Sequence, residues 1–98
     1  MHEHGLAKEL WPQLQGIAET KGLKRVELVE MIVGMLHGVA AEMLAHSFEH
    51  AFAGSNFQGA QVTITIVDPG DEYTPPNSDR PVKASGWELL IVRMEGKE

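Results

Sequence analysis

The sequence predicts an α/β fold, a small two-layer domain in which two helices pack on one face of a three-stranded mixed sheet. Two stretches carry apolar residues at helical spacing, and a third alternates apolar and polar residues as a half-buried strand does. The chain has 98 residues, 43% of them apolar, which is enough for one domain with one modest core. The expected order along the chain is helix, strand, helix, strand, loop, strand.

Residues 5–21 are expected to form the first helix, which Gly22 ends. One apolar stripe runs through it: Leu6, Leu10, Leu14, Ile17 and Ala18. Pro12 lies inside this helix, where a proline lacks the N–H donor and crowds the preceding turn at a cost of about 3 kcal/mol or more. Either the helix is kinked near residues 8–12, or its regular part starts at Trp11. The unbroken stripe favours the kink.

The next elements are expected to form a strand–helix–strand unit. Residues 25–33 are rich in β-branched and apolar types and read as a strand. Residues 40–53 read as a helix that Gly54 ends, with a broad apolar face made of Ala40, Met43, Leu44, Ser47, Phe48, Ala51 and Phe52. Residues 61–67 alternate strictly, so one face of that strand is buried and the other faces water. Its two faces carry Val62, Ile64 and Ile66, and Gln61, Thr63 and Thr65.

The composition changes after the second strand. Residues 68–86 hold four of the five prolines, two glycines and six charged residues, which is typical of a long loop or a poorly ordered excursion. Residues 87–94 resume as a strand that can return antiparallel. It is apolar on both faces, with Leu89 and Ile91 on one and Leu90, Val92 and Met94 on the other. Such a strand is buried on both sides or meets a partner chain, so a homodimer is possible.

Composition excludes several classes of function. The net charge of −6 disfavours nucleic acid and anionic membranes as partners. The absence of cysteine excludes disulfide scaffolds, thiol catalysis, zinc fingers and iron–sulfur clusters. The longest apolar run, residues 31–36, falls far short of the roughly 20 residues that span a bilayer. The first residues do not resemble a signal peptide, and we therefore expect a soluble cytoplasmic protein.

The first candidate site is the segment Met1-His2-Glu3-His4. A free α-amine, the amide nitrogen of residue 2 and the His2 imidazole can close fused chelate rings on one ion, a nitrogen-rich set that suits Ni(II) and Cu(II). Glu3 or His4 could supply a further metal ligand, or could orient one of the other ligands through a hydrogen bond. The alternative interpretation is a frayed terminus with two solvated histidines.

A weaker surface candidate is the polar side of the second helix. His46 and His50 lie four residues apart, with Glu42 and Glu49 beside them, and such a pair can hold a divalent ion. The glutamate is not in the position that zinc proteases require, so that mechanism is excluded. The alternative is an ordinary solvated helix face. His37 lies in the turn before this helix and is expected to be an ordinary turn residue. The alternative is that it faces a metal held by the N-terminus.

Catalysis has little support in the sequence. We find no acid–base pair that points to an enzyme, and Ser47 lies on an apolar helix face without the glycines of a nucleophile elbow. An enzyme would have to use the His/Glu face of the second helix. The sequence therefore predicts a protein that is not an enzyme.

Short segments spread along the chain carry a family resemblance. They are Met1-His2-Glu3, Gly5-Leu6-Ala7, Lys24-Arg25-Val26, Val33-Gly34, Gly38-Val39, Glu42-Met43-Leu44, Ser47-Phe48-Glu49, Gly54-Ser55, Gly59-Ala60-Gln61-Val62-Thr63-Ile64 and Gly86-Trp87-Glu88-Leu89-Leu90-Ile91. In these segments, over about residues 1–67 and 86–95, the chain resembles the nickel metallochaperones of hydrogenase and urease maturation, the HypA/HybF family. Their order and spacing agree with the fold expected above.

The resemblance implies a function. Family members bind Ni(II) as cargo through Met-His-Glu, so Met1, His2 and Glu3 are the residues that carry over. The partners implied are maturation proteins or the apo-form of a hydrogenase-type nickel enzyme. Family members also carry a zinc domain built from two Cys-x-x-Cys pairs between the second and last strands. Here residues 68–86 stand in its place, no structural zinc is expected, and residues 1–98 form a single HypA-like domain.

A second hypothesis assigns no metal to the chain. A degenerate paralogue could act as a protein-interaction module in enzyme maturation, docking through the last strand or an open sheet edge. The sequence also does not separate nickel from copper, because both suit the proposed nitrogen ligands and copper generally binds more tightly.

Overall fold

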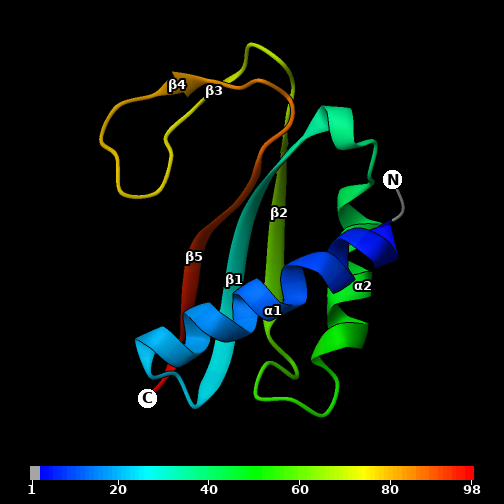
Figure 1. Ribbon diagram of the computed structural model, residues 1–98, viewed down its shortest axis with the longest axis vertical. Coiled ribbons are helices and arrows are strands. Elements are labelled where there is room, and N and C mark those ends of the chain that lie inside the picture. The colour runs from blue at the N-terminus through cyan, green and yellow to red at the C-terminus, as the bar shows by residue number, and fades with distance from the viewer. Residues whose placement is uncertain (1–2) are drawn as a thin grey trace.

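The computed structural model describes residues 3–98 (Figure 1). Its elements are α1 (Glu3–Lys21), β1 (Arg25–Gly34), the 3-10 helix η1 (Met35–His37), α2 (Ala41–Phe52), β2 (Gln61–Val67), β3 (Glu72–Tyr73), β4 (Val82–Lys83) and β5 (Leu89–Lys97). The main sheet has the strand order β2-β1-β5. β1 runs parallel to β2, with α2 in the crossover between them, and antiparallel to β5. The predicted α/β fold with a three-stranded mixed sheet is confirmed.

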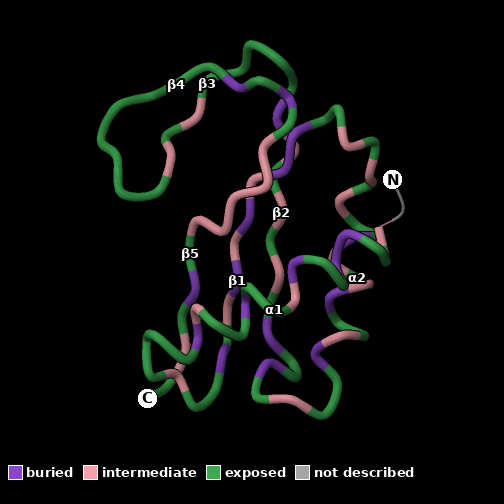
Figure 2. The backbone as a smooth tube through the Cα atoms, in the orientation of Figure 1, coloured by how far each residue is buried: buried purple, intermediate pink, exposed green. Residues whose placement is uncertain are grey.

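Both helices contribute to one core. α1 crosses in front of the strands and α2 lies beside β2 (Figure 1). Figure 2 shows buried stretches in α1, β1 and α2. The largest fully buried side chains are Leu6 and Leu14 of α1, Leu44, Phe48 and Phe52 of α2, Val26, Val29, Met31 and Val33 of β1, and Phe57 of the loop before β2. Trp11 packs on Phe52 and Phe57 with ring centroids 5.3 and 4.9 Å away. The predicted apolar stripes therefore form the core, and the alternation of β2 leaves Gln61, Thr63 and Thr65 exposed.

α1 runs as one helix through Pro12, so the alternative start at Trp11 is wrong. Pro12 is exposed, as is Lys8 one turn earlier. The proline therefore lies on the outer side of the helix, and the buried stripe of α1 runs past it unbroken. The expected kink near residues 8–12 stays a prediction.

The apolar face of α2 is narrower than predicted. Leu44, Phe48 and Phe52 are buried at helical spacing, whereas Met43 is 60% exposed. Adjacent helix residues point about 100° apart, so Met43 turns away from the ridge that begins at Leu44.

β5 differs from its predicted range and faces. It begins at Leu89 rather than Trp87, and Trp87 is 61% exposed. The pairing of β5 with β1 slips between Glu30–Arg93 and Met31–Ile91, which leaves Val92 as an extra residue. One extra residue moves the following side chain to the opposite face. Met94 was expected on the face of Leu90 but is buried in the core with the face of Leu89 and Ile91.

The Pro-rich excursion contains a short hairpin that the sequence did not predict. β3 and β4 form a two-stranded antiparallel sheet, pairing Glu72 with Lys83 and Tyr73 with Val82. The loop lies beyond one end of the main sheet (Figure 1). The single-domain organisation of residues 1–98, with residues 68–86 as a replacement segment, stays a prediction.

Candidate metal centre

The first two residues of the expected nickel set, Met1 and His2, lie outside the described residues. Glu3 is the first residue of α1, and its Oε2 accepts a hydrogen bond from the backbone N–H of Ala40 at 3.1 Å. Ala40 is the residue immediately before α2. The Glu3 carboxylate therefore ties the start of α1 to the start of α2, and Glu3 is the first member of the expected set that the structure describes.

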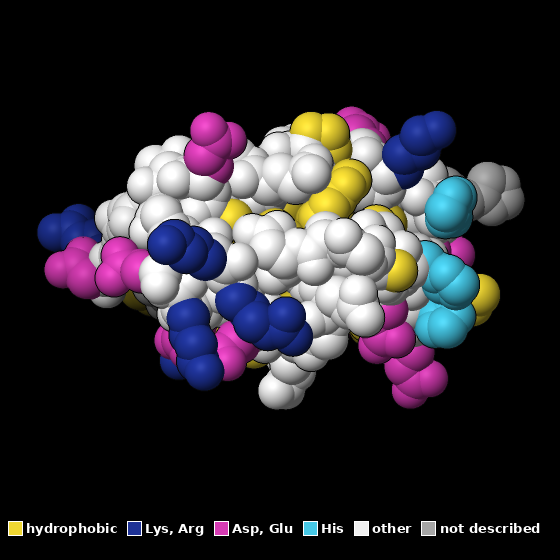
Figure 3. Space-filling view, turned by 90° about the horizontal axis from the view of Figure 1, so that it is seen from below, with side chains coloured by type: hydrophobic (Ala, Val, Ile, Leu, Met, Phe, Trp, Pro, Cys, Tyr) yellow, Lys and Arg dark blue, Asp and Glu magenta, His cyan; other side chains and the backbone are white. Residues whose placement is uncertain are grey.

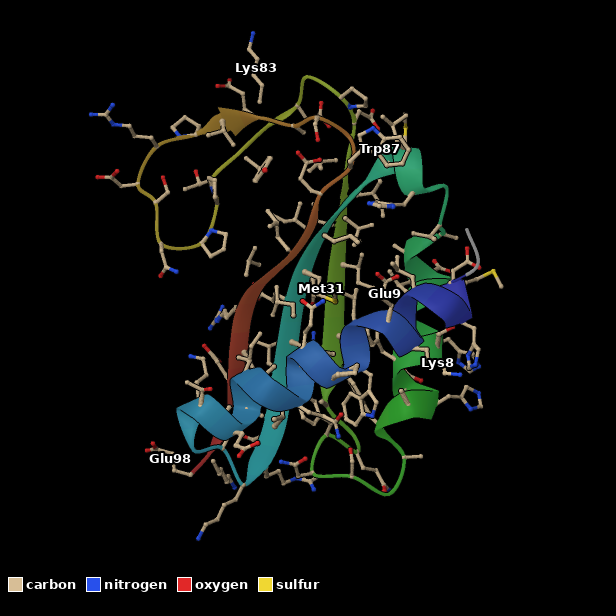
Figure 4. The ribbon with its side chains drawn as sticks, in the orientation of Figure 1. Lys8, Glu9, Met31, Lys83, Trp87 and Glu98 are labelled. Carbon is tan, nitrogen blue, oxygen red and sulfur yellow. The ribbon has the colours of Figure 1, made fainter. Side chains whose placement is uncertain are left out.

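His4 is exposed and faces α2. It lines a shallow pocket whose other residues are Ala7, Lys8 and Trp11 of α1 and Ser47 and Ala51 of α2. Lys8 can be followed in Figure 4 where α1 crosses α2. His4 thus borders the contact between the two helices, beside Ser47 and Ala51, which follow His46 and His50 in the sequence.

His46 and His50 lie together on what we call the α2 outer face, defined by His46, Glu49 and His50. The two imidazole rings are 4.8 Å apart between centroids and meet edge-on at 86°. Glu49 places its Oε2 3.8 Å from the Nδ1 of His46. Figure 3 shows histidine side chains gathered at one end of the molecule. The predicted proximity is present, although within residues 3–98 no group of three or more His, Asp or Glu side chains is arranged to hold an ion.

His37 has a partner elsewhere. Its Nε2 lies 3.0 Å from the backbone oxygen of Trp87, and its ring meets the indole edge-on at 5.3 Å between centroids. Because a carbonyl only accepts, the Nε2–H must donate. That nitrogen is therefore engaged in a structural contact between η1 and the chain entering β5.

A carboxylate that sequence analysis did not single out organises that same region. Glu88 accepts hydrogen bonds from the N–H and hydroxyl of Ser85 at 2.7 and 3.2 Å, from the N–H of Gly86 at 2.9 Å and from the Tyr73 hydroxyl at 3.4 Å. The Ser85 hydroxyl in turn accepts the N–H of Trp87 at 3.1 Å. We call Gly34 and residues 85–88 the Glu88 junction.

Hydrogen bonds and partial burial shift the pKa of Glu88 in opposite directions, and the hydrogen bonds have the larger effect. Removal from water raises the pKa of Glu88, but the donors of Ser85 and Gly86 stabilise the charged form more, so the pKa lies below its ordinary value. Removal from water, and then the negative charge and hydrogen bond of Glu88, raise the pKa of Tyr73. The lowered pKa of Glu88 and the raised pKa of Tyr73 are both expected if the fold holds the Glu88 carboxylate in its charged form.

Sequence comparison assigns the family. Residues 1–70 match the family model described as "Hydrogenase/urease nickel incorporation, metallochaperone, hypA". This chain belongs to the HypA family. A protein of Nitrosospira multiformis named "Hydrogenase maturation factor HypA" is 33% identical over 96 residues, which cover 98% of this chain and 81% of that protein. A protein of the same name from Thermococcus gammatolerans is 34% identical over 62 residues, or 63% of this chain and 45% of that protein.

A solved structure has the same fold. The solution structure of the Ni metallochaperone HypA from Helicobacter pylori aligns with a TM-score of 0.66 and 18% identity, covering 99% of this chain and 98% of that one. The chain spans about half the length of several curated relatives, 45% for Thermococcus gammatolerans and 57% for Moorella thermoacetica. Across residues 3–98 no helix is long and apolar enough to span a membrane.

Family membership leaves the site residues as predictions. Nickel is the metal that the family description names. The nickel set Met1, His2, Glu3 and His4 and the surface pair His46 and His50 stay untested, as does the replacement of a zinc domain by residues 68–86.

Proposed function

We propose that this HypA-family protein binds Ni(II) through Met1-His2-Glu3, with His4 as a further donor, and delivers it to a hydrogenase-type nickel enzyme. The observation that carries the proposal is the family match, which begins at residue 1 and so includes this segment. The relatives' shared name, hydrogenase maturation factor, supports the type of client. The role is delivery in the cytoplasm, and catalysis is not part of it.

The donors proposed are the Met1 amine, the backbone nitrogen of His2 and the His2 imidazole. Four nitrogen or oxygen donors in a plane suit Ni(II), and Glu3 or His4 can complete the set. The Oε2 of Glu3 already accepts the N–H of Ala40. A carboxylate has further lone pairs, so Glu3 can bind the ion and keep this hydrogen bond, which would hold the metal set against the start of α2.

Binding by these groups depends on pH. An amine and an amide must lose protons before they ligate nickel, so affinity falls as the solution becomes acidic. Release at neutral pH therefore needs a partner, either a maturation protein or the apo-enzyme, that offers better ligands or pulls the terminus away.

The test is a nickel titration by calorimetry on protein with a native Met1. The comparison proteins carry one extra N-terminal residue or His2→Ala. The proposal requires about one tightly bound equivalent in the native form and the loss of this tight binding in both others. Equal affinity in all three would overturn it. A parallel copper titration asks which ion the set prefers, since copper is expected to bind more tightly by chemistry alone.

A metal-independent docking role is the second candidate. Three large apolar side chains, Met35, Leu36 and Trp87, are 46%, 43% and 61% exposed, and all lie at η1 or the entry to β5. Exposed apolar patches mark interaction sites. If protein with a blocked N-terminus still supports enzyme maturation while Trp87→Ser does not, this role replaces nickel delivery.

A further inference from the structure

The α2 outer face has the geometry of a metal site of its own. His46 and His50 are both exposed and stand one helical turn apart with rings 4.8 Å between centroids. Imidazoles at positions i and i+4 on one helix face can bind the same ion, as in zinc protease helices. Both rings already face water, so an ion can reach them without breaking core contacts.

Glu49 lies beside one ring of the pair. Its Oε2 is 3.8 Å from His46 Nδ1, which is longer than a hydrogen bond and becomes one after a small rotation of either exposed side chain. A carboxylate beside one ring nitrogen favours the tautomer with its proton there. The lone pair of His46 is then on Nε2, which is the arrangement seen where metal-binding histidines donate their other N–H to a carboxylate.

The surface around the rings leaves room for an ion and its waters. His46, Glu49, His50 and Ala53 together line a shallow concave surface. Ala53 has the smallest side chain of the four and follows the last residue of α2. Two protein ligands are fewer than a closed structural site uses, so water must complete the coordination and exchange must be fast.

We infer that His46 and His50 bind a divalent transition-metal ion of the nickel, copper and zinc class, oriented by Glu49. These ligands differ from those proposed at Met1-His2-Glu3, so the inference goes beyond the proposed function. Ser47 and Ala51, which follow His46 and His50 in the sequence, line the pocket of His4. Because the ligands are side chains of α2, the site does not require a free N-terminus.

The probe is Ni(II) added to protein that carries one extra N-terminal residue, which removes the terminal amine from the set. A two-imidazole site completed by water is octahedral, and octahedral Ni(II) is paramagnetic. Planar nickel with four nitrogen donors is diamagnetic. We expect backbone NMR signals of residues 42–53 to broaden at about one equivalent, and we expect His50→Gln to abolish this broadening at the same nickel concentration.

Two further variants test whether binding depends on the i, i+4 placement of two histidines and on the neighbouring carboxylate, and not simply on how many histidines the protein has. Glu42→His combined with His50→Gln restores an i, i+4 pair with His46 and should restore broadening. Glu49→Gln should weaken binding about tenfold, the lower end of what the loss of an orienting partner costs. The metal-free spectra show whether each variant is folded.

The result that overturns the inference is equally specific. If broadening survives His50→Gln, or disappears with His4→Gln while His46 and His50 are intact, the ion is not held by the α2 pair. If no broadening occurs in folded extended protein, the pair is an ordinary solvated face.

Discussion

The Glu88 junction and the α2 outer face each place a glutamate close to polar partners, but the two carboxylates are used differently. Glu88 accepts two backbone N–H groups and two hydroxyls from Tyr73, Ser85 and Gly86. Glu49 lies 3.8 Å from one histidine on an open surface. A carboxylate with its lone pairs filled by the backbone stabilises the fold, whereas one beside an exposed imidazole leaves capacity for a ligand.

Substitutions in the two regions should therefore affect stability differently. At the junction, Gly34 donates its N–H to the Glu88 carbonyl at 2.8 Å, and Leu36 donates to the Gly86 carbonyl at 2.9 Å. β1, η1 and β5 therefore meet through backbone groups that cannot move independently. On the α2 outer face, only exposed side chains meet, so changes there should alter binding and leave stability nearly unchanged.

The largest effect is expected from Gly34→Ala. A Cβ at Gly34 would overlap the backbone carbonyl of Gly86, and backbone cannot give way as a flexible side chain can. We expect a loss of about 3 kcal/mol in the free energy of unfolding, measured by urea denaturation. Gly16→Ala is the matched control, because no atom lies within 4 Å of its Cβ position on α1 and alanine favours a helix by up to about 1 kcal/mol. Similar behaviour of the two variants would mean that the junction is not tightly packed.

A smaller effect is expected from Glu88→Gln. Loss of charge-assisted hydrogen bonds should cost about 1–2 kcal/mol at pH 7. The pKa of Glu88 is lowered in the folded protein, so its contribution to stability is present above the unfolded pKa of about 4.3 and is lost as pH falls through the folded value. Urea midpoints between pH 7 and pH 3 should therefore fall less steeply in Glu88→Gln than in the parent.

Glu9→Gln serves as the control for that pH series. Glu9 is exposed on α1, and its substitution should leave the acid-induced loss of stability in place. Parallel pH curves for the parent and Glu88→Gln would show that the carboxylate is not the group that titrates.

The smallest effect is expected from His50→Gln without metal. The ring is exposed, and surface substitutions of this kind usually change stability by less than about 0.5 kcal/mol. Thermal unfolding in the presence of a chelator measures it. A loss of more than 1 kcal/mol would show that the ring pair stabilises α2, and would remove the contrast between the two regions.

Apolar spacing was sufficient to predict the main elements. In α1 apolar residues repeat at helical spacing, and in β2 they alternate with polar ones. Each pattern is long enough to define a buried face. The faces of β5 were predicted incorrectly beyond Val92, because a bulge is set by pairing with β1 and not by the sequence of β5 alone. Met43 is exposed although the sequence predicts it on the buried face of α2, because apolar character alone does not fix how wide a buried helix face is.

The sites differed in how far sequence could predict them. The proximity of His46 and His50 follows from helical spacing alone. The junction at Glu88 depends on hydrogen bonds to backbone groups, which side-chain chemistry does not reveal. One signal was present: Ser85 and Glu88 have the Ser-x-x-Glu spacing of a capping box. One of the two bonds of that motif forms here, from the Ser85 N–H to Glu88 Oε2, whereas the Ser85 hydroxyl accepts the N–H of Trp87 instead of that of Glu88. β3 and β4, of two residues each, are too short for any periodicity to show.

The position of β1 in the sheet has a consequence for synthesis of the protein. Its two neighbours are β2 and β5, and Arg25 pairs with Lys97 across the second of these. A ribosome produces residue 25 long before residue 97, so one edge of β1 and the place of Met94 in the core stay uncovered until the last strand leaves the exit tunnel. Residues 1–70, which match the family model, lack β5 entirely. A nascent chain of that length should be a good substrate for proteases and trigger-type chaperones, and resistance should arise only after β5 emerges.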